Sequence, residues 1–195
     1  YAQAYFSYDS KKSGGVTRSH LRFSKNPIRS TYLVTKPTFV SCAVPAYLGK
    51  YDMISGLIIG GTFLLNTIWD KDKLLKNIPN EIKRELAIKG AKFYVINATK
   101  LAKEIGLGNR INTIMQSAFF YLTNIIPYEE SKQYMRDFVE KTYSRKSREI
   151  IEQNWTAIER AVEELEEIFV DPEWKYLPIN EEIINKEKKI KIPKC

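Results

Sequence analysis

Residues 8–22 read YDSKKSGGVTRSHLR, and this stretch contains the turn around which the first part of the chain is predicted to fold. An alternating, aromatic-rich run, residues 1–8, leads into the turn, and a second alternating run, residues 16–23, leads out of it. Two runs with a period of two residues around a polar Ser/Gly turn predict a β-hairpin. We therefore expect an antiparallel element at the start of the chain.

The turn itself carries two lysines, Lys11 and Lys12, beside Gly14 and Gly15. Glycine lets a backbone approach a ligand closely, and lysine supplies a positive point charge. These residues predict that an anion, most simply a phosphate, binds at the hairpin tip. A solvated tip that binds nothing explains the same residues equally well.

Composition points to one globular domain with an anionic ligand or partner. The 195 residues are 44% hydrophobic and 28% charged, and the net charge is +8. Residues 1–30 hold six Lys or Arg and a single acid, Asp9. An excess of positive charge favours anions. A nucleic-acid-binding module is the general alternative, but no motif with suitably spaced aromatic residues supports it.

The middle of the chain alternates short apolar runs with helical patterns. Strands are predicted at residues 38–44, 62–66 and 92–96, and helices at 46–53, 70–76, 80–89 and 100–105. Asn80 and Thr99 are expected to be the N-caps of two of these helices. The alternation predicts an α/β fold in three layers, αβα, whose mostly parallel sheet is mixed because of the antiparallel hairpin.

The C-terminal part is predicted to be helical, at residues 111–122, 129–143 and 148–168. Five glutamates within 159–167 are expected to form a solvated face. Residues 1–170 are expected to form the domain, and residues 171–195, rich in Lys and Glu, a linker to the next domain.

A second candidate anion site is the segment GLGNRIN, residues 106–112, which leads into the first of these C-terminal helices. A Gly-rich turn before a helix presents free N–H groups and the positive end of the helix dipole. Arg110 could pair with phosphate, and Asn109 or Asn112 could hydrogen-bond amide or hydroxyl groups. The alternative is a tight turn whose asparagines only cap the helix.

The remaining reactive residue types are expected to be structural. His20 is the only histidine and has no partners at triad spacing, and Asp70 and Asp72 are typical of a helix start. Cys42 lies in an apolar run and is expected to be a buried thiol, and with Cys195 it forms no zinc or iron–sulfur pattern. No catalytic or metal-binding residue is therefore assigned.

No secretory leader is visible, and the longest apolar run, residues 54–65, is interrupted by glycines and too short to span a bilayer. We therefore expect a cytoplasmic protein without a membrane partner.

Several motifs in the same order resemble those of the pyruvate:ferredoxin (flavodoxin) oxidoreductase family. They are YDSKKSGG at 8–15, SHLR at 19–22, PIRS at 27–30, PAY at 45–47, GGTFLLN at 60–66 and GLGNRIN at 106–112. The resemblance covers about residues 1–170 and is to an internal domain, the equivalent of the gamma subunit of split 2-oxoacid:ferredoxin oxidoreductases. In that family a strand, a Gly-rich turn and a helix precede the point where this sequence begins, so we expect them to be missing.

The resemblance implies an enzyme that oxidatively decarboxylates pyruvate to acetyl-coenzyme A and CO2 and reduces ferredoxin or flavodoxin. It implies that thiamine diphosphate and iron–sulfur clusters are held by other domains, that the full enzyme is a homodimer, and that this chain alone is inactive. It associates this domain with coenzyme A, whose phosphates suit the two candidate anion sites. The implied binding residues are Lys11, Lys12, Ser13, Gly14, Asn109, Arg110 and Asn112. A purely structural domain of the same enzyme is the alternative.

Overall fold

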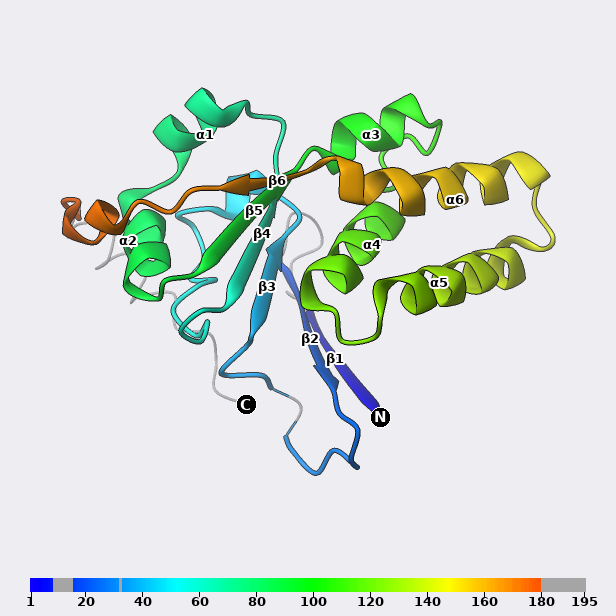
Figure 1. Cartoon of the computed structure of the whole chain (residues 1–195), viewed down its shortest axis with the longest axis horizontal. Helices are drawn as coiled ribbons and strands as arrows, with labels where there is room; N and C mark the ends of the chain where they lie inside the picture. The colour runs from blue at the N-terminus through cyan, green and yellow to red at the C-terminus, as the bar shows by residue number, and fades with distance from the viewer. Residues whose placement is uncertain (9–15, 32, 180–195) are drawn as a thin grey trace. The chain divides into compact units, whose positions relative to one another are not determined.

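The computed structural model describes residues 1–8, 16–31 and 33–179 (Figure 1). These residues form two compact units, Tyr1–Pro37 and Thr38–Cys195, each with its own architecture. The hairpin tip, and with it Lys11, Lys12, Ser13 and Gly14, lies outside the described residues. None of the helices in the described part of the chain is both long and apolar enough to cross a membrane.

The first unit is the predicted hairpin. Strand β1 (Ala2–Tyr8) pairs antiparallel with β2 (Thr17–Phe23), from Ala2 opposite Phe23 to Tyr8 opposite Thr17. This full-length pairing confirms the two alternating runs as strands. The chain then folds back across one face of the hairpin, where the Arg22 guanidinium donates to the carbonyl oxygens of Thr31 and Leu33.

The second unit contains a sheet of four strands in the order β3-β4-β5-β6: β3 (Phe39–Cys42), β4 (Thr62–Asn66), β5 (Lys92–Ile96) and β6 (Leu165–Ile168). The first three strands are parallel, and β6 is antiparallel to β5. Alternation along β4 sends Phe63 and Leu65 into one core and Leu64 into the other. A strand that is buried on both faces therefore reads as a continuous apolar run.

Helices cover both faces of this sheet (Figure 1). The core that contains Phe63 and Phe93, whose rings stack 5.5 Å apart, also contains side chains of α1 (Lys71–Asn77) and α2 (Asn80–Ile88). The core around Leu64 contains side chains of α3 (Ala98–Glu104), α4 (Asn112–Thr123) and α6 (Arg148–Glu163). Helix α5 (Tyr128–Tyr143) packs beside α6. The predicted three-layer α/β fold with a mixed, mostly parallel sheet is confirmed, but the predicted reason for the mixing is wrong. The hairpin forms a sheet of its own, and the antiparallel strand of the large sheet is β6.

Two predicted helices are wrong in extent. The helix expected at 46–53 is only a 3-10 turn, η1 (Pro45–Tyr47): Leu48 is already extended, and Gly49 after it takes a left-handed conformation with φ of 74°. The helix expected at 148–168 ends at Glu163, and Leu165–Ile168 instead forms β6. Pairing with the edge of β5 is a non-local interaction, which outweighs the local helical pattern there.

The predicted caps also differ from the structure. Asn80 is the first residue of α2 rather than its cap, and its side-chain amide donates to the Pro178 carbonyl oxygen, 3.0 Å away. The cap of α3 is Asn97, whose side chain accepts from the Lys100 backbone N–H. The Thr99 hydroxyl instead accepts from the Asn66 side-chain amide. In both cases a tertiary partner, which the local sequence does not show, decides the role of the residue.

Two polar segments make more contacts than the sequence predicts. Glu159 lies within the expected solvated face, but it forms ion pairs with Lys132 and Arg136 of α5. The first residues of the predicted linker form the 3-10 helix η2 (Pro172–Tyr176), and Arg84 of α2 donates to the Leu177 carbonyl oxygen at 2.8 Å. The linker assignment of 171–195 stays a prediction, and residues 180–195 lie outside the described part.

Candidate functional site

A buried asparagine ties together the carboxyl ends of the parallel strands, the edge where open α/β sheets bind ligands. Asn66, the last residue of β4, is only 3% exposed. Its amide nitrogen donates to the Ala43 carbonyl oxygen at 2.9 Å and to the Thr99 hydroxyl at 3.2 Å. Its amide oxygen accepts from the Ala98 backbone N–H at 3.0 Å. One side chain thus fixes where α3 begins relative to β3 and β4.

Asn66 belongs to the motif GGTFLLN, but the motif alone assigns it no role. The available signal was a polar residue at the end of a buried apolar run. Its partners lie 23, 32 and 33 residues away along the chain, so the sequence alone could not identify them.

The Gly-rich loop follows at the other end of α3. Gly106 and Gly108 both have positive φ, 84° and 64°, and Leu107 between them is buried. A Cβ atom added to Gly106 would lie 2.5 Å from the Gln153 side-chain nitrogen of α6. The left-handed backbone at 106 therefore favours glycine, and any larger residue there would also displace the end of the Gln153 side chain.

This close approach gives a testable result. We expect Gly106→Ala to lower the free energy of unfolding by about 2 kcal/mol, because left-handed strain costs about 1–2 kcal/mol and Gln153 must also move. Gly108→Ala is the matched control: its φ is also positive, but nothing lies within 4 Å of the added Cβ. It should cost about 1 kcal/mol. Equal losses in urea unfolding would show that the contact with Gln153 is unimportant.

The structure gathers three of the predicted binding residues, Asn109, Arg110 and Asn112, on the exposed end of this loop. The Arg110 Nε donates to the Leu107 carbonyl oxygen at 3.1 Å, which fixes the start of the guanidinium within the loop. Asn112 is the first residue of α4, and the N-cap is Ile111, which makes no side-chain cap bond. The alternative in which Asn112 caps the helix is thus not what the structure shows.

The binding role of all seven predicted residues stays a prediction. Four of them, Lys11, Lys12, Ser13 and Gly14, lie outside the described part of the chain.

The single histidine contributes to the hairpin's backbone contacts. His20 Nδ1 accepts from the Val34 N–H at 3.2 Å. Partial burial, and then the positive charges of Arg18 and Arg22, lower the pKa of the imidazole. A neutral imidazole with Nδ1 as acceptor fits this contact, so the predicted structural role holds. Cys42 is likewise buried as predicted, and burial raises the pKa of its thiol.

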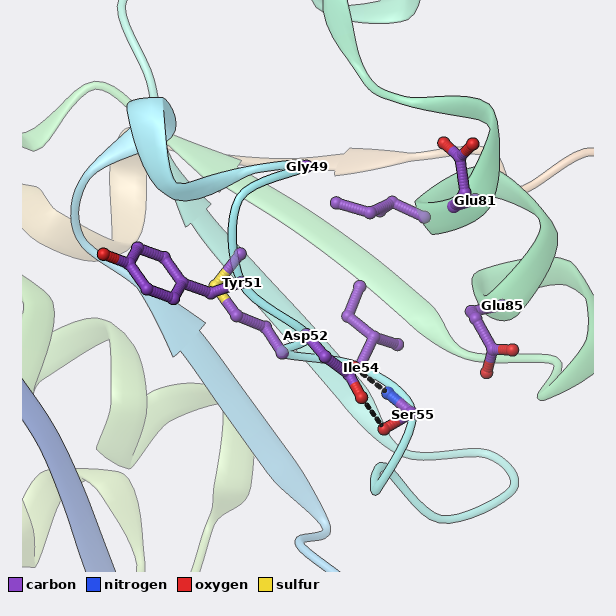
Figure 2. Close-up of a pocket in the computed structure, with 9 residues that line it drawn as sticks. Gly49, Tyr51, Asp52, Ile54, Ser55, Glu81 and Glu85 are labelled. Atoms are coloured by element: carbon purple, nitrogen blue, oxygen red, sulfur yellow. Dashed lines mark hydrogen bonds between the residues drawn. The ribbon is translucent and has the colours of Figure 1, made fainter. Parts of the chain in front are cut away.

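A separate pocket on the other face of the sheet is acidic and does not involve the predicted residues. It measures about 90 Å³ and lies between the loop that contains Asp52 and helix α2, which contributes Glu81 and Glu85 (Figure 2). Asp52 accepts hydrogen bonds from the Ser55 N–H and hydroxyl. Carboxylates repel phosphate, and ligand pockets usually measure about 300–1,000 Å³, so we do not assign coenzyme A to it.

The sheet, its two helical layers and the Gly-rich loop define a three-layer α/β domain with a candidate anion-binding loop. The chain belongs to the pyruvate ferredoxin/flavodoxin oxidoreductase family, whose family model matches residues 1–164. The family expected from the sequence motifs is thus confirmed.

Curated relatives agree with this assignment. The chain is 49% identical over 174 residues to the pyruvate:ferredoxin oxidoreductase of Moorella thermoacetica. The aligned region covers 89% of this chain and 15% of that protein. It is also 48% identical over 177 residues to the pyruvate-flavodoxin oxidoreductase of Enterobacter agglomerans, and this aligned region covers 91% of this chain and 15% of that protein. The chain thus spans about 15% of the length of these relatives.

A solved structure shows a similar fold. The pyruvate oxidoreductase subunit PORC of Thermotoga maritima superimposes with a TM-score of 0.65 over 87% of this chain and 82% of that subunit. The sequences are 23% identical, so this likeness supports the fold alone.

Proposed function

We propose that this chain is one domain of a larger enzyme that oxidatively decarboxylates pyruvate to acetyl-coenzyme A and CO2 and reduces ferredoxin or flavodoxin. The observation that carries the proposal is the 49% identity to the Moorella thermoacetica pyruvate:ferredoxin oxidoreductase over 89% of the chain. We propose that thiamine diphosphate and the iron–sulfur clusters are held by other domains, and that the chain alone has no turnover.

We propose further that this domain binds coenzyme A and contacts neighbouring domains. Coenzyme A supplies the thiol that accepts the acetyl group, and its phosphates are polyanionic. The exposed loop at Asn109 and Arg110 fits such a group, because Arg110 supplies a positive charge two residues before α4 begins and Ile111 leaves the first turn of that helix without a side-chain cap. These residues would bind and orient the coenzyme and would not react with it.

The proposed partners are the other domains, ferredoxin or flavodoxin, and a second copy of the full enzyme in a cytoplasmic homodimer. No nucleic-acid or membrane partner is proposed. Calorimetric titration of the full-length enzyme separates the alternatives. Coenzyme A should bind more tightly than dephospho-coenzyme A. Equal binding of any polyanion would favour a nucleic-acid-type surface.

A single substitution tests the loop. We expect Arg110→Ala in the full-length enzyme to raise the KM for coenzyme A about threefold to tenfold, because it removes one charge-assisted contact that is partly screened by water. Lys71→Ala removes the same charge from α1, on the opposite face of the sheet, and should leave that KM unchanged. An unchanged KM in Arg110→Ala would leave the loop with a structural role only.

A further inference from the structure

Exposed apolar side chains gather at the end of the sheet opposite the carboxyl ends of the parallel strands. Ile59, Ile88 and Phe169 are 85%, 58% and 73% exposed. They come from the loop before β4, the last turn of α2 and the residue after β6. The Gly60 N–H donates to the Lys89 carbonyl oxygen at 2.8 Å, which brings the first two segments together.

A hollow of about 260 Å³ lies at the same end of the sheet. It lies between the end of α2, the start of β5 and the chain after β6, and Phe169 is one of its lining residues. Ala87 and Ala91 contribute apolar wall, and Lys92 and Glu167 are the charged residues of the lining. Pairing of Ile168 with Phe93 holds the chain after β6 beside the start of β5. Ala87 and Gly90, which flank Ile88 and Lys89 in the chain, line the hollow, and the Gly60–Lys89 bond holds the segment of Ile59 beside them. We call the hollow and the three exposed side chains the Ile59–Ile88–Phe169 patch.

We propose that another domain of the same polypeptide docks on the Ile59–Ile88–Phe169 patch with an apolar side chain inserted beside Phe169. This inference rests on the proposed function, in which the chain is one domain of a longer enzyme. The relatives are far longer than the region they share with this chain, which is 15% of their length. The exposed side chains of the patch are apolar, so a partner would contact them with apolar side chains. The rest of the proposed polypeptide has a large surface that could supply them.

Size favours a domain of the same polypeptide over a second copy of the chain. A large aromatic side chain covers on the order of 150–250 Å² and isoleucine covers less, so one partly exposed phenylalanine and two partly exposed isoleucines offer at most about 400 Å². A stable dimer of separate molecules buries about 800 Å² on each partner. A domain linked in the same polypeptide is at millimolar effective concentration, so a much smaller contact is sufficient.

Photo-crosslinking in the full-length enzyme tests this docking. The photoreactive residue p-benzoylphenylalanine is incorporated in place of Phe169, and the crosslinked peptides are identified by mass spectrometry. The matched control is incorporation in place of Phe138 on α5, which has a similar exposure of 64% but lies in the helical layer beyond the other face of the sheet. We expect Phe169-site crosslinks to peptides outside residues 1–195 of the same polypeptide, in at least fivefold higher yield than at the Phe138 site.

Three results would overturn the proposal: crosslinks confined to residues 1–195, a covalent dimer of two polypeptides through the Phe169 site, or equal yields at the two sites. The readout does not depend on turnover. Pyruvate-dependent reduction of ferredoxin by the unmodified enzyme is measured in parallel, so failure of the proposed function is seen separately from failure of the docking.

Discussion

Asn66→Ala should lower the free energy of unfolding of the chain by about 3 kcal/mol, because it leaves buried polar groups without partners. The Ala98 N–H loses its acceptor in a fully buried position, and the Thr99 hydroxyl and the Ala43 carbonyl oxygen lose their donor. Urea unfolding followed by circular dichroism measures the loss.

The control is Asn97→Ala, one residue before α3. Asn97 accepts one hydrogen bond from the Lys100 N–H at the partly exposed start of the helix. Losing such a cap typically costs about 1 kcal/mol. If both variants lose the same amount, Asn66 acts as an ordinary polar residue and does not hold the strand ends together.

The Asn66 junction also explains which parts of the fold the sequence predicts well. Strands β4 and β5 are buried apolar runs bounded by turns, and their predicted limits match the structure. Their identity is set locally by composition and length. The roles of Asn66 and Thr99 depend on residues far along the chain. The local sequence around Thr99 therefore predicted a helix cap, although its hydroxyl accepts from Asn66.

The same reasoning explains β6. Leu165 and Ile168 are spaced as on a helix, so the predicted helix ran through both of them to residue 168. Strand β5 offers an unpaired edge at that point, and backbone pairing with it satisfies more polar groups than another helical turn would. Local periodicity contains no information about that edge.

In the candidate site, too, the locally determined features were predicted and the tertiary contacts were not. Two glycines in GLGNRIN predicted a turn before a helix, and Gly106 and Gly108 do take positive φ. The contact of Gly106 with Gln153 could not be predicted, since it requires the packing of α6 against the loop. The hairpin was predicted from its alternation, but its tip gives a hypothesis about chemistry that only an experiment on function can test.

Lys11→Ala combined with Lys12→Ala should raise the KM of the full-length enzyme for coenzyme A by about tenfold to a hundredfold. A charge-assisted contact contributes about 1.5–3 kcal/mol when it is shielded from water. Screening at an exposed tip lowers this to a factor of about three to ten for each lysine, so the loss of two gives about tenfold to a hundredfold. These lysines lie in the most basic part of the chain, on a tip whose glycines let a ligand approach the backbone. The effect should shrink at high salt if the contact is exposed.

The charge-matched control is Lys71→Ala combined with Lys76→Ala on α1, which should leave the KM for coenzyme A unchanged. Pyruvate decarboxylation before acyl transfer should stay near normal in both double variants, because the proposed contact involves only the coenzyme. A further comparison with dephospho-coenzyme A identifies the phosphate: if the lysines bind the 3′-phosphate, their loss should reduce the difference between the two ligands. An unaltered KM in the Lys11/Lys12 variant would make the tip a solvated turn. The anion site would then have to be sought at Asn109, Arg110 and Asn112.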